Sequence, residues 1–209
     1  MPPPCVKLSG FGIRRRYVGL LGGSFNPAHD GHRHISLAAL RLLGLDEVWW
    51  LISPQNPLKP TAGMAPLSQR LAYAATIARH PRIRVTAMEM CLGTRYTADT
   101  LRELTRRFPR IRFVWLMGAD NLTQISAWAR WKEIFRRVAI AVFAREPYSL
   151  RALAGKAGRR YARARLGGKA RRLPFSTPPA WVFLAVRPHP ASATKIRTTT
   201  DWRESLTTS

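Results

Sequence analysis

Six short runs of apolar, β-branched and aromatic residues recur along the chain. Most are apolar at consecutive positions, which is typical of strands buried on both faces of a parallel sheet. The runs are YVGLL (17–21), EVWWLI (47–52), IRVTAM (83–88), IRFVWLM (111–117), VAIAVF (138–143) and WVFLAV (181–186). They predict a central parallel sheet of about six strands.

Helix-like segments lie between these runs. In GHRHISLAALRLLG (31–44), apolar residues fall near one face and Gly44 provides a stop. Further helices are predicted over 67–80, 97–108 and 126–137, the last with an amphipathic pattern. Alternation of strands and helices at this spacing predicts a doubly wound, Rossmann-like α/β fold with helices on both faces of the sheet.

The alternation breaks over residues 145–180, which are rich in Arg, Lys, Gly, Ala and Pro. We predict a helix around 149–166 and then a loop through LPFSTPPA. This stretch has too few apolar residues for a core of its own, so we treat it as a basic excursion. The predicted organisation is a flexible basic segment over 1–16 and a single domain over 17–209.

The chain is strongly basic, with 35 Lys and Arg against 11 Asp and Glu and a formal net charge of +24. Such a charge favours anionic partners, either nucleic acid or phosphorylated small molecules, although a solvated basic surface is the plain alternative. The sequence has no apolar run of membrane-spanning length and no recognisable secretory signal. Two cysteines without suitably spaced histidines predict no zinc site, and we name no metal-ligating residue. We expect a cytoplasmic protein that does not bind membranes. Formation of a homo-oligomer is possible from the sequence but is not predicted by it.

The loop between the first predicted strand and helix carries the residues GGSFNPAHDGH (22–32). Gly22 and Gly23 remove side chains where a ligand can approach the backbone. His29 and His32 are about one helical turn apart, so both imidazoles can face the same way. Free N–H groups and the helix dipole favour an anion at a helix start, and open α/β sheets bind ligands at this edge. The stretch therefore predicts a phosphate cradle.

A purely structural role for the same residues is the alternative. Glycine-containing turns before helices are common, and a single histidine is more often a surface or core residue than a ligand. The pattern is neither a Walker P-loop, which needs GK[ST], nor GxGxxG. The combination at one strand–loop–helix junction favours function.

Several motifs in a fixed order resemble a known family. HDGH (29–32) resembles the HxGH signature of a nucleotidyltransferase superfamily. Four further stretches resemble motifs of bacterial nicotinate-nucleotide adenylyltransferases. SPQNPLKP (53–60) resembles the family's loop after the second strand, and RYTADTL (95–101) resembles its YTxDTL element. LMGADNL (116–122) resembles its GxD element, and ASATKIR (191–197) resembles its C-terminal signature. HxGH alone marks the superfamily, whereas the motifs together indicate the narrower family.

The resemblance implies adenylyl transfer from ATP to nicotinate mononucleotide, a step of NAD biosynthesis that yields nicotinate adenine dinucleotide and pyrophosphate. The attacking phosphate is already ionised, so no protein base is required, and catalysis consists of positioning and charge stabilisation. His29, His32 and Arg197 are the implied catalytic residues. The implied ATP-binding residues are Gly22, Gly23, Ser24, Phe25, His29, His32, Asp120, Ser192, Thr194 and Arg197. Mg²⁺ is expected to bridge triphosphate oxygens without a dedicated carboxylate cage.

Nicotinate mononucleotide is expected to contact five residues. Trp128 is expected to stack on the pyridine ring, with core packing as its alternative role. Tyr96 and Thr97 offer backbone and hydroxyl donors to the nicotinate carboxylate. Asn56 and Lys59 lie in the loop after the second strand, where amide donors or a positive charge favour a carboxylate over a neutral amide.

Structural alternatives exist for the remaining site residues. Asp120 either accepts hydrogen bonds from ribose hydroxyls or caps a helix. Ser192, Thr194 and Arg197 either bind phosphate or form an ordinary capped helix with a surface arginine.

Three features depart from the family pattern. Ala191 stands where isoleucine is common, the end of the chain is short and polar, and residues 145–180 are unusually basic. Two rival functions follow. One is adenylyl transfer to nicotinamide mononucleotide or phosphopantetheine by another HxGH enzyme, and the other is a basic nucleic-acid-binding module.

Overall fold

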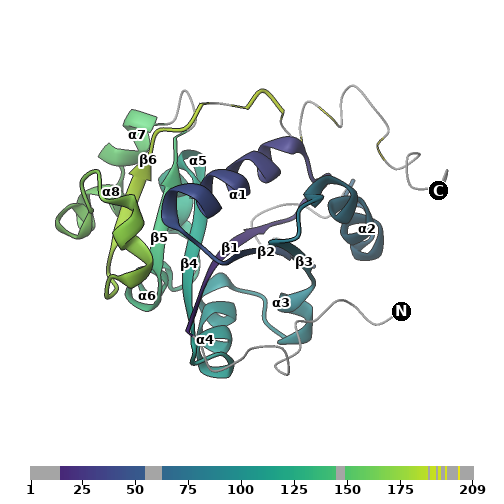
Figure 1. The fold of residues 1–209 in the computed structure, drawn as a ribbon, viewed down its shortest axis with the longest axis horizontal. Helices are drawn as coiled ribbons and strands as arrows, with labels where there is room; N and C mark the ends of the chain where they lie inside the picture. The colour runs from purple at the N-terminus through teal and green to yellow at the C-terminus, as the bar shows by residue number, and fades with distance from the viewer. Residues whose placement is uncertain are drawn as a thin grey trace.

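A parallel sheet forms the centre of the molecule. The structure, a computed structural model, describes residues 15–54, 63–144, 149–187, 189–191, 193, 196 and 202. The sheet has six strands in the order β3-β2-β1-β4-β5-β6, and every neighbouring pair is parallel (Figure 1). The strands are β1 (Arg16–Gly23), β2 (Glu47–Ile52), β3 (Ile83–Thr86), β4 (Ile111–Gly118), β5 (Ala139–Phe143) and β6 (Trp181–Leu184). The predicted doubly wound fold of about six strands is confirmed.

Helices cover both faces of this sheet. The helices are α1 (Asp30–Leu43), α2 (Leu67–Ala78), α3 (Met88–Cys91), α4 (Thr97–Arg107), α5 (Ala119–Gln124), α6 (Trp131–Arg137), α7 (Ser149–Ala154) and α8 (Lys156–Arg160). Short 3₁₀ helices are η2 (Ile125–Ala127), η3 (Ala162–Ala164) and η4 (Ala170–Phe175). Buried residues of α1, α2 and η4 join one core, whereas those of α3 to α8 join the other.

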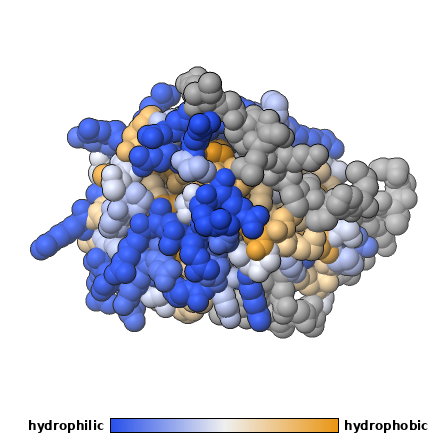
Figure 2. Space-filling model, turned by 90° about the horizontal axis from the view of Figure 1, so that it is seen from below, coloured by the Kyte–Doolittle hydropathy of each residue, from blue (hydrophilic) through white to orange (hydrophobic). Residues whose placement is uncertain are grey.

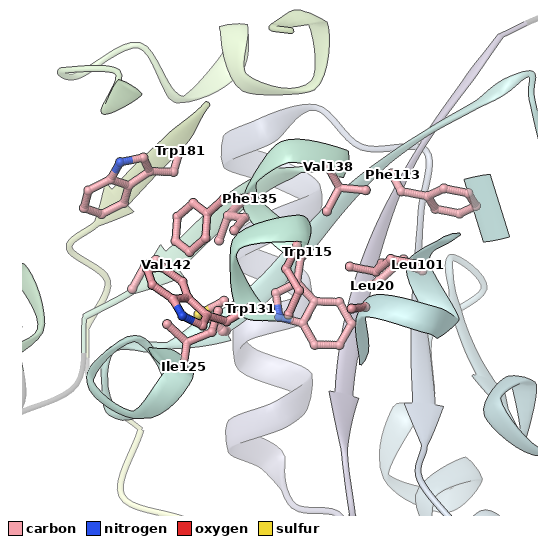
Figure 3. Close-up of a cluster of buried hydrophobic side chains, with 14 of the residues drawn as sticks. Leu20, Leu101, Phe113, Trp115, Ile125, Trp131, Phe135, Val138, Val142 and Trp181 are labelled. Carbon is pink, nitrogen blue, oxygen red and sulfur yellow. The ribbon is translucent and has the colours of Figure 1, made fainter. Parts of the chain in front are cut away.

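Alternation along each strand divides the buried side chains between the two cores. Leu20 and Trp49 belong to the core under α4 and α6, while their neighbours Leu21 and Trp50 belong to the core under α1 and α2. All six residues of β2 are buried. Figure 3 shows large aromatic side chains in the first of these cores, with Trp115 beside Leu20. Burial on both faces explains why the strands appear as continuous apolar runs in the sequence.

The sheet has its topological switch point between β1 and β4. From β1 the chain passes through α1 to β2, and from β4 it passes through α5 and α6 to β5, on the other side. The connections therefore diverge at the carboxyl ends of β1 and β4, which are Gly23 and Gly118. A crevice at such a point is the usual ligand-binding place in open α/β sheets.

Two predicted helices are wrong in extent. The helix predicted over 126–137 begins only at Trp131, because Trp128 is extended and Arg130 has a left-handed backbone with φ 51°. The helix predicted around 149–166 is divided at Gly155, whose extended backbone separates α7 from α8. In both places the amphipathic pattern continues through a turn, so periodicity alone did not reveal the break.

The basic excursion packs on the sheet through a few apolar residues. Ala152, Ala157 and Tyr161 join one core, and Leu173 joins the other. The Leu166 amide donates to the Trp181 carbonyl at 2.8 Å, which attaches the excursion to the edge strand β6. Figure 2 shows hydrophilic side chains over much of the coloured part of the face that it draws. Within the described ranges, no helix has both the length and the apolar composition needed to span a lipid bilayer.

A buried carboxylate joins three strands at the amino-terminal edge of the sheet. Glu47, 4% exposed, accepts hydrogen bonds from Arg84 Nε at 2.8 Å and Trp49 Nε1 at 2.9 Å, and pairs with Arg16 at 3.1 Å. Burial acts to raise the pKa of Glu47, but the hydrogen bonds from Arg84 and Trp49 and the charges of Arg84 and Arg16 lower the pKa below its ordinary value. The ionised form therefore stabilises the folded protein.

We predict that Glu47→Gln lowers the free energy of unfolding by about 1–3 kcal/mol at pH 7, because the variant keeps the volume but loses a buried charge that holds two arginines. The lowered pKa means that the contribution is present above the ordinary carboxyl pKa and is lost as pH falls through the folded-state value. Urea unfolding at pH 7 and at more acidic pH measures both effects. Equal unfolding free energies at pH 7 would contradict the role of Glu47.

Candidate active site

The loop after β1 leads directly into the first turn of α1, at the switch point of the sheet. Gly22 and Gly23 end β1, and Phe25 has a left-handed φ of 45°. The Phe25 side chain is 2% exposed and stacks on Trp50, with ring centroids 5.1 Å apart. Any contact of Phe25 with a nucleotide must therefore come from its backbone.

His29 and His32 lie side by side at the start of α1, as the sequence predicted from their spacing. His29 is the N-cap residue, and the two ring centroids are 3.8 Å apart. The His29 amide donates to His32 Nδ1 at 3.1 Å. Because Nδ1 accepts this bond, the neutral His32 ring carries its proton on Nε2. His32 thereby presents a donor nitrogen, and both side chains are only partly buried.

The polar and aromatic surroundings of His32 hold the first turn of α1 against β2. The Ser36 hydroxyl donates to the His32 carbonyl at 2.8 Å and accepts from Trp50 Nε1 at 2.8 Å. The Phe25 ring packs on the His32 ring with centroids 4.5 Å apart. These contacts restrict the imidazole without burying it in the core.

The segment after β6 returns to the start of α1. A Cβ added to Gly31 would lie 2.8 Å from His29 Nδ1 and 3.2 Å from the Ala191 carbonyl oxygen, so glycine permits a close approach of the two chain segments. His34 Nε2 lies 2.9 Å from the Arg187 carbonyl oxygen. The beginning of the ASATKIR motif therefore lies beside the HDGH motif, although the two are far apart in the sequence.

Asp120 lies at the carboxyl end of β4, the strand next to β1. It is the second residue of α5, whose N-cap is Gly118, so Asp120 does not cap this helix. The Asp120 carboxylate turns back toward Gly118, where an added Cβ would clash with Oδ1. Ligands of open α/β sheets usually bind outside the carboxyl ends of the strands, which is where Asp120 lies.

Trp128 is partly buried at the edge of the core rather than inside it. Its ring meets the Trp115 ring edge to face, with centroids 6.5 Å apart. Trp115 in turn fills the space beside Gly22, since an added Cβ there would clash with its ring. Trp128 is thus joined to the end of β1 through one buried tryptophan, and part of its ring stays accessible.

Tyr96 and Thr97 occupy the start of α4, with Tyr96 as the N-cap and 38% exposed. The Arg130 guanidinium lies 5.6 Å from the centre of the Tyr96 ring, within cation–π range, and also forms an ion pair with Asp99. Arg130 therefore connects the YTADTL element to the turn that carries Trp128. The structure brings these two predicted substrate-binding segments together.

Five predicted site residues lie outside the described part of the chain. They are Asn56, Lys59, Ser192, Thr194 and Arg197. Their roles stay predictions.

Two buried polar residues near the carboxyl end of β2 are not predicted from the sequence. Arg70 on α2 is 1% exposed and donates four hydrogen bonds to backbone carbonyls. Glu89 on α3 is 6% exposed, and burial raises its pKa to about 7, although a hydrogen bond with Ser53 acts in the opposite direction. A signal for Arg70 exists in the sequence, because it lies on the same helical face as the buried residues Ala74 and Ala78.

The described residues include no cluster of three or more His, Cys, Asp or Glu placed to hold a metal ion. Asp120 is a carboxylate in the first turn of α5, directly after β4. At nucleotide sites Mg²⁺ is commonly held mainly by phosphate oxygens and water, with few protein ligands.

Comparisons with known proteins agree with this geometry. The profile of the cytidylyltransferase-like family matches residues 20–199. A Parvibaculum lavamentivorans protein described as "Probable nicotinate-nucleotide adenylyltransferase" is 55% identical over 88% of this chain and 92% of its own length. A Cereibacter sphaeroides protein with the same description is 54% identical over 89% of this chain and 98% of its own length.

A solved structure shares the fold. The Plasmodium falciparum nicotinic acid mononucleotide adenylyltransferase complexed with NaAD aligns with a TM-score of 0.65 at 15% identity, over 88% of this chain and 83% of that chain. The shared fold agrees with the family match and with the two sequence relatives. The chain therefore belongs to the cytidylyltransferase-like family and, within it, to the nicotinate-nucleotide adenylyltransferases.

Proposed function

We propose that this protein transfers the adenylyl group of ATP to nicotinate mononucleotide, which gives nicotinate adenine dinucleotide and pyrophosphate in NAD biosynthesis. The observation that carries the proposal is the His29–His32 pair at the start of α1, located at the switch point of the sheet. The identity of 54–55% to relatives described by this activity supports the choice of reaction. A cytoplasmic location is part of the proposal.

The reaction needs no protein base. A phosphate oxygen of nicotinate mononucleotide attacks the α-phosphorus of ATP, and the bond from that phosphorus to the bridging oxygen breaks. Pyrophosphate leaves with the bonding electron pair. A phosphate monoester with a second pKa of about 6 is largely ionised at neutral pH, so the nucleophile is ready without proton removal. The protein therefore contributes positioning and charge stabilisation.

The imidazoles of His29 and His32 act on the leaving group. The Nε2–H of His32 donates toward the phosphates, because its Nδ1 is occupied by the His29 amide. Arg197 supplies a guanidinium to the same phosphates, and the position of Ala191 beside Gly31 supports this arrangement. Donors that are already oriented stabilise the charge that develops on pyrophosphate without further reorganisation.

The remaining proposed contacts with ATP surround this pair. Backbone N–H groups of Gly22, Gly23, Ser24 and Phe25 line the phosphates, and Asp120 accepts hydrogen bonds from ribose hydroxyls. Ser192 and Thr194 donate hydroxyl groups to phosphate. Mg²⁺ bound to the triphosphate oxygens would neutralise part of their negative charge.

The pyridine site is formed by the neighbouring segments. Trp128 stacks on the ring, and Tyr96 with Thr97 donates to the carboxylate at the start of α4. Asn56 and Lys59 add donors from the loop after β2. A carboxylate gains charge-assisted hydrogen bonds at such a site that a neutral amide does not, so the acid should be preferred.

We predict that nicotinate mononucleotide reacts at least about tenfold faster than nicotinamide mononucleotide, a difference of roughly 1.4 kcal/mol. Pyrophosphate release with ATP and Mg²⁺ measures each acceptor in turn, with phosphopantetheine as a third. Equal rates with the acid and the amide would refute the specificity. Absence of release with nicotinate mononucleotide, together with release with another acceptor, would refute the proposed substrate.

A second prediction concerns the imidazole donor. His32→Ala should lower kcat by about 10²–10³, the cost of removing one oriented donor, while the variant stays folded because the ring is only partly buried. His80→Ala is the matched control, since His80 precedes β3 at the opposite edge of the sheet and accepts the Arg82 amide there. Steady-state kinetics of both variants measure kcat, and thermal melting shows whether each variant is folded. A folded His32→Ala with unchanged kcat would exclude the donor role.

A further inference from the structure

Arg70 is an arginine buried in the interior without a carboxylate partner among the described residues. Burial lowers the pKa of Arg70, because removal from water disfavours the charged guanidinium. An arginine in this situation is retained only if its hydrogen bonds compensate. The partners of Arg70 therefore indicate what the residue is for.

Four of the five N–H groups of Arg70 reach backbone carbonyls from three separate segments. Nη1 donates to the Ser24 carbonyl at 2.6 Å and to the Ser53 carbonyl at 2.7 Å. Nη2 donates to Pro54 at 3.0 Å, and Nε donates to Ala65 at 2.9 Å. Ser24 belongs to the loop after β1, Ser53 and Pro54 follow β2, and Ala65 precedes α2.

Asn26 reinforces the same connection from the opposite direction. Its side-chain amide donates to the Gly63 carbonyl at 3.1 Å and accepts from the Ala65 amide at 3.1 Å. Arg70 and Asn26 together thus form six hydrogen bonds that join the loop of the HDGH motif to residues 53–54 and 63–65. We name this set of contacts the Arg70 clamp.

We propose that Arg70 is a positioning residue for adenylyl transfer, which holds the phosphate-binding backbone at Ser24 and the backbone after β2 in one fixed arrangement. The inference rests on the proposed function. Arg70 does not touch the reacting atoms, because its guanidinium is enclosed by carbonyls. It acts through the loop between β1 and α1, which carries Ser24 at one end and His29 at the other.

The requirement is for arginine and not only for a positive charge. The planar guanidinium presents donors in several directions within one plane, so a single side chain reaches carbonyls on three segments. Lysine offers three donors on one atom and cannot reach all four oxygens at these distances. Loss of the clamp would leave buried carbonyls without donors, and the loop would shift to hydrate them.

A small shift of this loop matters for catalysis more than for overall stability. The donors at the start of α1 act only when they meet the phosphates in the productive geometry, and a displacement of about 1 Å can cost about 10²-fold in rate. The sheet itself is joined elsewhere by backbone pairing of all six strands. Loss of the Arg70 clamp should therefore lower kcat while the protein stays folded.

The test compares Arg70→Lys and Arg70→Met with Glu47→Gln, a variant that loses stability at the opposite edge of the same sheet. We expect kcat to fall about tenfold in Arg70→Lys and about a hundredfold in Arg70→Met, measured well below each melting temperature, and to stay within twofold of wild type in Glu47→Gln. Hydrogen exchange followed by mass spectrometry should show faster exchange in residues 20–32 and 63–66 of the Arg70 variants, with β4 to β6 unchanged.

Three results would overturn the proposal. The first is that the Arg70 variants fold and keep kcat within twofold of wild type. The second is that hydrogen exchange over residues 20–32 is unchanged in these variants. The third is that kcat falls as much in Glu47→Gln as in the Arg70 variants. If Arg70→Met does not fold, the Lys variant decides. If wild-type protein releases no pyrophosphate, the proposed function fails, whereas the exchange experiment still decides whether Arg70 holds the two loops together.

Discussion

The hydrogen bond from the His29 amide to Nδ1 of His32 fixes the tautomer of the neutral His32 ring at the carboxyl edge of the sheet. Either ring nitrogen of a neutral histidine can carry the proton. Because Nδ1 accepts this hydrogen bond, the proton is on Nε2, which is left as a donor. The bond exists because His29 is the N-cap and His32 is the third residue of α1. The dipole of the same helix favours an anion at that place, so backbone and imidazoles support the same chemistry.

The position of this helix start depends on the sheet. Strands buried on both faces leave no room for polar side chains in their centres, so the polar chemistry of the molecule lies at the two edges. At the amino-terminal edge, Glu47 is stabilised by two arginines and a tryptophan. At the carboxyl edge, Arg70 is stabilised by carbonyl oxygens alone. The first arrangement supports stability, and the second orients a loop.

Part of the high positive charge lies away from the candidate site. Nine Lys and Arg residues of 151–172 belong to a segment that attaches to the edge strand β6, whereas the candidate site lies at the ends of β1 and β4. A basic surface raises the local concentration of phosphorylated substrates by electrostatic attraction without contributing any specific contact. Charge alone did not distinguish an enzyme for nucleotides from a nucleic-acid-binding module, and the motifs were needed to do so.

The sequence by itself determined the number of strands, their burial on both faces and the position of the imidazole pair, because these depend on local periodicity and on residues three apart. It placed β2 at its observed bounds but continued two helices through turns at Arg130 and Gly155, since periodicity does not register a single residue with a non-helical backbone. Only the tertiary structure brought Ala191 beside Gly31, Arg130 over Tyr96 and the Arg70 guanidinium between three segments. These contacts join residues distant in sequence, and the order of the strands in the sheet decides which distant segments meet.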